Sequence, residues 1–245
     1  MNRRNVLIAA AIAAAMMASS SGQAARPCAP PQAGIQGGTP VNTSCPTGGS
    51  YSTTFPLNES PISENGNWVN NASGAFNHPV STTGGHAVGP TSSGDNDAIA
   101  QLVGTYGRDQ TITAHAYHSG SSGAAEIELH LRMRTLSTGE VYTYEVDIIP
   151  SLSEINLMKW SGTQGSVVQL ATVPISGVND GDTFVASAIG PGNATVFTIK
   201  LNGTTLLTYT DTSAFTTGNP GIGLDAGNSS DGANFGWADF SVTTN

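Results

Sequence analysis

The chain of 245 residues has few basic side chains. It holds 8 lysines and arginines against 17 aspartates and glutamates, which gives a formal net charge of -9 at pH 7. Nucleic-acid binding depends on a stripe of Lys and Arg side chains that neutralise phosphates. Binding to an anionic membrane surface needs a similar basic cluster. We therefore expect neither a nucleic acid nor a membrane as the partner.

Long hydrophobic runs are also scarce. The apolar stretch of residues 6–18 follows Arg3 and Arg4 and is too short to remain in a bilayer as a span. Small residues come next, with Gly22-Gln23-Ala24 as a cleavage site. This order is typical of a secretory signal peptide, so we expect residues 1–25 to be removed. The mature protein is then expected to be secreted, periplasmic or at the cell surface.

Cysteine is almost absent. Cys28 and Cys45 are the two in the chain, and both lie in residues 26–52, which are rich in Pro, Gly and Ser. Such a composition predicts a linker rather than a packed core. In an exported chain the two cysteines are expected to form one disulfide, which would contribute about 3 kcal/mol in the chain-entropy model. Neighbouring His or Cys ligands for a metal are missing there.

Helical apolar stripes are absent after the signal. From Thr53 onward, short runs rich in Val, Ile, Thr and Tyr alternate with turns of Gly, Asn, Asp and Ser. Strands are expected at 53–57, 67–69, 98–103, 110–117, 126–134, 140–149, 154–160, 166–173, 182–189, 194–201, 204–210, 221–225 and 235–243. This pattern predicts an all-β protein, with one antiparallel two-sheet β-sandwich over residues 53–245.

The end of the chain carries a family resemblance. Asn202-Gly203 makes a hairpin turn, Asp211-Thr212 follows, and the closing segments are Thr217–Leu224 and Gly236–Val242. This order resembles the end of a concanavalin A-like (laminin-G/glucanase type) β-sandwich. The resemblance implies a jelly roll in which a concave sheet carries the ligand. Lectins, glycan-cleaving enzymes and adhesion modules share this fold, so the resemblance leaves all three functions open.

Charged residues concentrate in residues 110–149, which we expect to form a three-strand meander. The candidate catalytic residues on its outward side are His115, Tyr117, Glu128, His130, Arg132, Glu145 and Asp147. The expected register places His115 beside His130 and His130 beside Glu145. The next row then holds Tyr117, Glu128 and Asp147. Cross-strand neighbours lie about 5 Å apart, so the side chains of each row would touch.

Such a patch has several interpretations. Paired carboxylates perform general acid/base catalysis, and a Tyr and a His beside an Arg abstract a sugar proton in polysaccharide lyases. His115, His130 and Glu145 would also suit a divalent metal. Against these stands a solvated, salt-bridged sheet face, which is common in antiparallel sheets.

One strand resembles part of a known catalytic motif. Glu145-Val146-Asp147 resembles the start of the E-x-D-x-x-E strand of retaining β-glucanases, which carries the nucleophile and the acid/base. The third acid would fall near Pro150, and proline cannot serve in that role. The motif is therefore incomplete on this strand.

Acidic turns and aromatic side chains suggest two other kinds of site. Asp95, Asp97, Asp180 and Asp182 offer hard oxygen ligands that suit calcium. Trp237 and Tyr117 are the expected ligand-binding aromatics, because a flat ring covers the apolar face of a sugar. Trp68 and Trp160 are expected in the core.

Three functional hypotheses follow. The first is a secreted carbohydrate-binding module for a neutral glycan, because an acidic surface repels polyanions. The second is a glycan-cleaving enzyme, a polysaccharide hydrolase or lyase, that uses the sheet face of residues 115–147. The third is a structural or adhesive surface protein.

Overall fold

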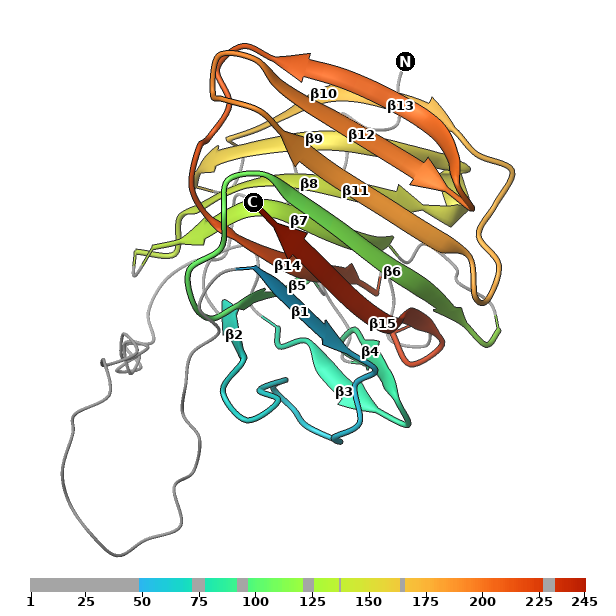
Figure 1. Ribbon diagram of the computed structural model, residues 1–245. Helices are drawn as coiled ribbons and strands as arrows, with labels where there is room; N and C mark the ends of the chain where they lie inside the picture. The colour runs from blue at the N-terminus through green and yellow to red at the C-terminus, as the bar shows by residue number, and fades with distance from the viewer. Residues whose placement is uncertain are drawn as a thin grey trace, which may run out of the picture.

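Two antiparallel sheets packed face to face form the protein in a computed structural model (Figure 1). The structure describes residues 49–71, 78–91, 97–120, 126–136, 138–163, 166–226 and 232–245. The strands are β1 (Ser50–Thr53), β2 (Trp68–Asn71), β3 (Ser81–Thr83), β4 (His86–Val88), β5 (Asp97–Leu102), β6 (Gln110–His118), β7 (Glu126–Thr135), β8 (Val141–Ile149), β9 (Glu154–Gly162), β10 (Val167–Pro174), β11 (Thr183–Ile189), β12 (Thr195–Leu201), β13 (Thr204–Asp211), β14 (Asn219–Asp225) and β15 (Phe235–Thr244). The one helical element in these ranges is the 3-10 turn η1 (Pro150–Leu152). The all-β prediction is confirmed.

The sheet nearer the viewer in Figure 1, here the front sheet, has the strand order β13-β12-β11-β6-β15-β4-β3, with β1 paired to β15. The back sheet has the order β10-β9-β8-β7-β14-β5-β2. Sequence neighbours such as β7, β8 and β9 pair directly, whereas β14 enters between β7 and β5. No helix in the described ranges is long and apolar enough to cross a membrane.

The core lies between the sheets and follows from strand alternation. Side chains at every second position of a strand point to the same side of the sheet. Six inward positions of β7 and β8 are apolar or aromatic, and none of them is more than 1% exposed; they are Ile127, Leu129, Leu131, Tyr144, Val146 and Ile148. The positions between them lie on the side that points away from the front sheet. That side, here called the outer face of the back sheet, carries the candidate site.

A buried polar cluster joins the two sheets. Tyr144 Oη on β8 donates a hydrogen bond of 2.5 Å to Asp211 Oδ2 on β13, and Lys159 Nζ on β9 donates one of 2.8 Å to the same oxygen. Burial raises the pKa of Asp211, but these donors and the Ser213 amide outweigh it and lower the pKa to about 2. The ionised Asp211 therefore stabilises the contact between the back and front sheets.

Some expected elements differ from the structure. The strands β3 and β4 were not expected, and the first strand is Ser50–Thr53 rather than 53–57. The expected meander is also wrong: β6 pairs with β11 and β15 in the front sheet, whereas β7 pairs with β8 and β14. Strand alternation is the same in either sheet, so it does not reveal that the chain crosses between sheets after β6.

Several predictions lie outside the described residues. They are the signal peptide, the linker up to residue 48, the disulfide between Cys28 and Cys45, and the calcium ligand Asp95. These stay predictions.

Candidate functional site

Acidic side chains gather on the outer face of the back sheet. They come from four adjacent strands at alternating positions: Asp97 on β5, Asp225 on β14, Glu126 and Glu128 on β7, and Glu145 and Asp147 on β8. The register places Glu128 opposite Asp147 and Asp225 between Asp97 and Glu126. We call these six residues the acidic cluster.

The three glutamates of the cluster hold their protons more strongly than free carboxyl groups do. Burial raises the pKa of Glu128 well above its usual range, and the charges of Asp97, Glu145 and Asp147 raise it further. Burial and Asp147 raise the pKa of Glu145 to about 8, although a hydrogen bond from Trp160 opposes the shift. Burial also raises the pKa of Glu126. No Lys or Arg of the described chain offsets these three shifts, so the cluster favours protons or a bound cation.

His130 stands among these acids on β7. Its Nε2 lies 2.9 Å from Glu128 Oε2, and its Nδ1 lies 3.3 Å from Thr143 Oγ1 on β8. The residue is fully buried, which lowers its pKa to about 3 and keeps the ring neutral at pH 7. One ligand atom each from Glu128, His130 and Glu145 lies within 4.8 Å of the others. A neutral imidazole with two carboxylates is a donor set for a divalent metal, and Thr143 would fix the ring orientation.

Glycine on β14 makes room for this arrangement. Gly221 and Gly223 lie on the outer face, opposite His130 and Glu128 respectively. A Cβ atom at Gly223 would lie 1.9 Å from Glu128 Oε2 and 2.6 Å from His130 Nε2. Both distances are far below van der Waals contact, so any larger residue at position 223 would displace the pair.

Trp160 on β9 borders the acidic cluster. Its Nε1 donates a hydrogen bond of 2.5 Å to Glu145 Oε2, and the side chain is partly exposed. Behind it, Ile99, Met133 and Val141 form a small buried apolar group on the same face. The prediction of Trp160 in the main core is wrong. Trp160 and the polar Asn156 are an even number of residues apart on β9. Strand alternation therefore places both side chains on the outer face, which the sequence could have indicated.

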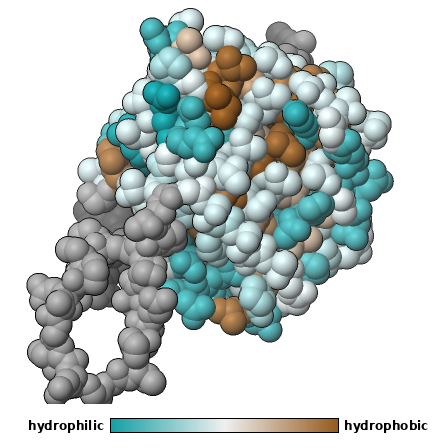
Figure 2. All heavy atoms as spheres, in the orientation of Figure 1, coloured by the Kyte–Doolittle hydropathy of each residue, from teal (hydrophilic) through white to brown (hydrophobic). Residues whose placement is uncertain are grey.

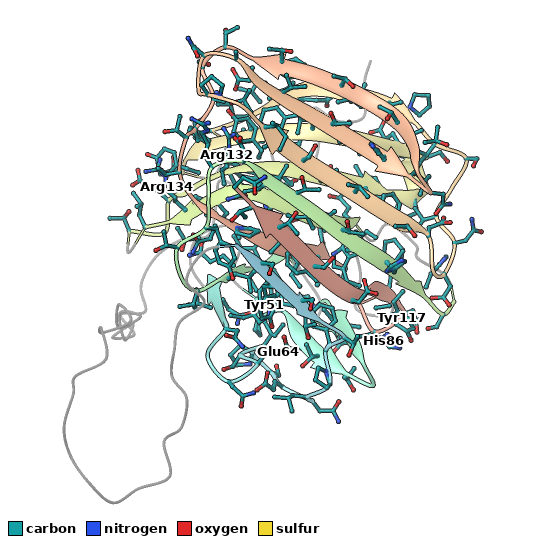
Figure 3. All side chains as sticks on the ribbon, in the orientation of Figure 1. Tyr51, Glu64, His86, Tyr117, Arg132 and Arg134 are labelled. Atoms are coloured by element: carbon teal, nitrogen blue, oxygen red, sulfur yellow. The ribbon has the colours of Figure 1, made fainter. Side chains whose placement is uncertain are left out.

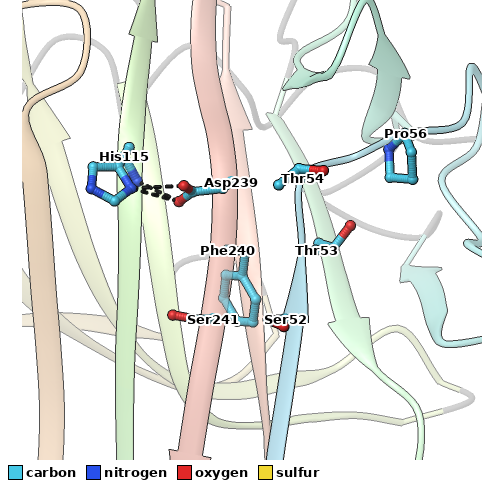
Figure 4. Close-up of a pocket in the computed structure, with 8 residues that line it drawn as sticks. All are labelled: Ser52, Thr53, Thr54, Pro56, His115, Asp239, Phe240 and Ser241. Carbon is cyan, nitrogen blue, oxygen red and sulfur yellow. Dashed lines mark hydrogen bonds and ion pairs between the residues drawn. The ribbon is translucent and has the colours of Figure 1, made fainter.

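The structure confirms two of the expected neighbour pairs and rejects two. His130 lies opposite Glu145, and Glu128 opposite Asp147, as expected. His115 and Tyr117 lie on the outer surface of the front sheet instead, because β6 belongs to that sheet. Asp239, which the sequence analysis missed, is the true partner of His115: its carboxylate oxygens lie 2.8 Å from His115 Nδ1 at the edge of a hydroxyl-rich pocket (Figure 4).

Tyr117 has a different neighbour from the one expected. Its ring stacks on His86 with centroids 3.7 Å apart and planes 7° from parallel (Figure 3). The face of the molecule seen in Figure 2 is mostly of intermediate hydropathy, with scattered hydrophilic and hydrophobic side chains. Tyr117 therefore stays a candidate ligand-binding aromatic on the front sheet, away from the catalytic row predicted for it.

Arg132, a candidate catalytic residue, is fully buried and lies on the inner side of the back sheet, away from the acidic cluster. A bulge in β7 between Leu131 and Arg134, with a φ of 54° at Arg132, turns this side chain inward and Met133 outward. The fully buried guanidinium donates hydrogen bonds to the carbonyl oxygens of Phe215 and Gly190 and to other acceptors. These bonds hold loops at one end of the sandwich. A bulge breaks alternation, so the sequence pattern did not reveal the inversion.

Trp237 is also unavailable as a binding surface. It is 0% exposed, and its Nε1 donates a hydrogen bond of 3.2 Å to the backbone oxygen of Glu128. The bulge in β15 between Trp237 and Asp239 places both Trp237 and Phe240 in the core, so the expected exposure is wrong.

The three expected calcium ligands that the structure describes, Asp97, Asp180 and Asp182, are not brought together as one group. Asp97 belongs to the acidic cluster. Asp180 accepts a hydrogen bond of 2.9 Å from the His118 amide, and Asp182 accepts one of 2.7 Å from the Asn179 amide. Asp182 therefore stabilises its own turn, whereas Asp180 links that turn to the end of β6. The metal-compatible group found in the described ranges contains neither of them.

Comparison with known proteins identifies the fold. No family model matches the chain, and no curated protein matches it. Solved structures do match. The Emp46p carbohydrate recognition domain in its potassium-bound form is 11% identical with a TM-score of 0.54, covering 78% of this chain and 94% of that one. A prokaryotic beta-1,3-1,4-glucanase (lichenase) derived from a mouse hindgut metagenome is 10% identical with a TM-score of 0.50, covering 80% and 100%.

The chain has a concanavalin A-like jelly-roll fold. At these identities the likeness shows the fold alone. Within this concanavalin A-like sandwich, Glu145 and Asp147 project from β8 onto the outer face, and the further acid beside them is Glu128 on the neighbouring strand. The position expected for a third acid, near Pro150, is the start of η1.

Proposed function

We propose that the protein is a carbohydrate-binding module and that it binds glycan on the outer face of the back sheet at Trp160. The supporting observation is the Trp160–Glu145 pair. A partly exposed indole is held by a hydrogen bond of 2.5 Å beside several carboxyl groups. An indole ring stacks on the apolar face of a pyranose, and adjacent carboxyl groups accept hydrogen bonds from its hydroxyls. The likeness to a carbohydrate recognition domain supports the same proposal.

The charge of the protein supports a neutral glycan. The net charge of -9 repels a polyanionic chain. We also propose that residues 1–25 direct export, so that the module meets its glycan outside the cytoplasm.

A divalent cation in the acidic cluster is part of this proposal. Glu128, His130 and Glu145 would hold it, and it would neutralise carboxyl groups that otherwise repel one another. Calcium prefers six to eight oxygen ligands, whereas imidazole suits zinc and similar metals. The donor set therefore fits a zinc-like ion better than the calcium expected from the acidic turns.

A glycan array with the purified protein tests the proposed function. Retention on one or more neutral glycans is the expected result, with none on sulfated polyanions. Failure to bind any glycan would contradict the proposal and favour the structural or adhesive alternative.

Glycan hydrolysis is a second candidate function, favoured by the Glu128–Glu145 geometry. Carboxylate oxygens of the two residues lie within 4.8 Å of each other, close to the roughly 5 Å separation of retaining glycosidases. A Glu145 with a pKa of about 8 is protonated at neutral pH, as a general acid must be, whereas Glu128 would have to lose its proton, against the effect of burial on its pKa, to act as the nucleophile. The lyase alternative loses its support, because Arg132 faces inward and His115 lies on the other sheet.

Polysaccharide cleavage assays decide whether this second function exists. If the wild type cleaves a polysaccharide, Glu145→Gln should abolish the cleavage without lowering the melting temperature. Full activity in that variant would place the chemistry elsewhere.

A further inference from the structure

A hollow of about 450 Å³ lies at the end of the back sheet, beyond Met133. Three segments that are distant in sequence line it: the end of β7, the end of β5 with the loop after it, and the turn that leads into β14. Its volume falls within the range of small-molecule sites, which is about 300–1,000 Å³. The acidic cluster contributes no residue to the lining, so the hollow is a separate feature of the fold.

Two polar groups in the lining have no hydrogen-bond partner. Tyr106 is 7% exposed and its hydroxyl is unpartnered, as is the buried Oε1 of Gln101. Burial raises the pKa of Tyr106 to about 12, so the hydroxyl keeps its proton and remains a donor. Buried polar groups in native proteins nearly always have a partner, and an exception calls for an explanation. A hydroxyl-rich ligand supplies both a donor and an acceptor to these atoms.

The charge of the lining is opposite to that of the protein. Arg134 is the one charged residue in it, and the lining includes no carboxylate. The guanidinium carbon lies 5.0 Å from the ring centroid of Tyr142 and 6.0 Å from that of Phe215, and it forms no ion pair within the described ranges. Figure 3 shows Arg134 at the edge of the sandwich, beside the buried Arg132. A guanidinium held against aromatic rings is suited to a carboxylate, which it binds through two parallel hydrogen bonds.

We propose that this hollow is a distinct subsite for a sugar residue that carries a carboxylate group. Arg134 binds the carboxylate, the Tyr106 hydroxyl donates a hydrogen bond to the sugar, and Gln101 Oε1 accepts one from a sugar hydroxyl. The inference rests on the proposed glycan binding and adds the class of sugar. A glycan that is neutral along most of its length and carries one acidic sugar residue could bind beside the acidic cluster with its neutral part and in the hollow with its acidic residue.

Calorimetric titration of the purified protein with monosaccharides tests this subsite. The probes are D-glucuronate and D-galacturonate, with D-glucose and D-galactose as neutral counterparts. We expect the wild type to bind at least one uronate about tenfold more tightly than its neutral counterpart, since a hydrogen bond to a charged group is stronger than a neutral one. Arg134→Gln should remove this preference. Arg108→Gln, which removes an exposed charge outside the lining, should retain it.

Tyr106→Phe provides an independent readout. It should weaken binding of the uronate several-fold while leaving the melting temperature equal or higher, because the deleted hydroxyl has no partner in the protein. Equal affinity for uronates and neutral sugars, or equal effects of Arg134→Gln and Arg108→Gln, would overturn the proposal. Retention of neutral glycans on an array without any uronate preference would overturn this subsite alone and leave the proposed function intact.

Discussion

His130 and Glu128 lie two residues apart on β7, with His130 Nε2 2.9 Å from Glu128 Oε2. Strand alternation places both side chains on the outer face, and the absence of a side chain at Gly223 leaves them the space to meet. Thr143 holds the other ring nitrogen from the neighbouring strand. Three strands therefore fix one buried histidine–carboxyl pair.

The space at Gly223 gives the first prediction. Gly223→Ala introduces a Cβ only 1.9 Å from Glu128 Oε2, so the pair must shift. We expect a loss of about 1–3 kcal/mol in the free energy of unfolding, measured by chemical denaturation. Gly120→Ala is the control, because the nearest atom to its Cβ is 3.7 Å away. Equal stability of the two variants would contradict the described packing.

Metal binding gives the second prediction. If Glu128, His130 and Glu145 hold a zinc-like ion, free zinc at 100 times its dissociation constant should stabilise the protein by about 2.7 kcal/mol. Thermal melting with zinc, calcium or a chelator measures this effect. His130→Ala should abolish the zinc response, whereas Asp180→Asn, outside the group, should keep it. If the wild-type melting curve is the same in zinc and in chelator, the proposed metal binding by this group is contradicted.

The Asp211 cluster predicts a specific response to acid. The folded-state pKa of Asp211 is about 2, below the usual 3.8, so its ionised form stabilises the native state above pH 3.8. That contribution, about 2 kcal/mol, is lost as the pH falls through 2. Denaturation of wild type and Asp211→Asn should therefore show a stability difference at pH 5 that shrinks toward pH 2. A difference that stays constant with pH would refute the ionised assignment.

The buried hydrogen bonds of Arg132 lead to a fourth prediction: a substitution of this residue should lower the stability of the fold without weakening glycan binding. Arg132→Lys keeps the charge but removes most of the hydrogen bonds to the carbonyl oxygens of Phe215, Gly190 and Arg108. We expect a destabilisation of about 2–4 kcal/mol, with an unchanged dissociation constant for any glycan the protein retains. A folded variant that loses its affinity for glycan would contradict this prediction and indicate that Arg132 contributes to the binding site.

Local patterns in the sequence predicted the strands and one half of the site. Alternation along β7 and β8, with the short turn between them, was enough to place His130 opposite Glu145 and Glu128 opposite Asp147. These contacts depend only on neighbouring strands. The closing segments likewise carried the resemblance to a concanavalin A-like fold, which the structure confirms.

The sequence alone did not indicate which strands pair when they are distant along the chain. His115 meets Asp239 from a strand 124 residues later, and the alternation of β6 is the same whichever sheet it joins. The bulges beside Arg132 and Trp237 invert a side chain by adding one residue, and no residue type in these strands marks them. Gly223 was also unpredictable, because its role depends on side chains of another strand.

The most direct test of glycan binding at the outer face of the back sheet compares two aromatic variants. The dissociation constant of a neutral glycan retained on the array is measured by calorimetry for wild type, Trp160→Ala and Tyr117→Ala. Trp160 lies beside the acidic cluster and Tyr117 on the opposite sheet, and both are partly exposed. We expect Trp160→Ala to weaken binding at least about tenfold, because stacking of a ring on a sugar is lost, and Tyr117→Ala to leave it unchanged. Loss of binding in Tyr117→Ala with full affinity in Trp160→Ala would contradict the account and place the glycan on the front sheet.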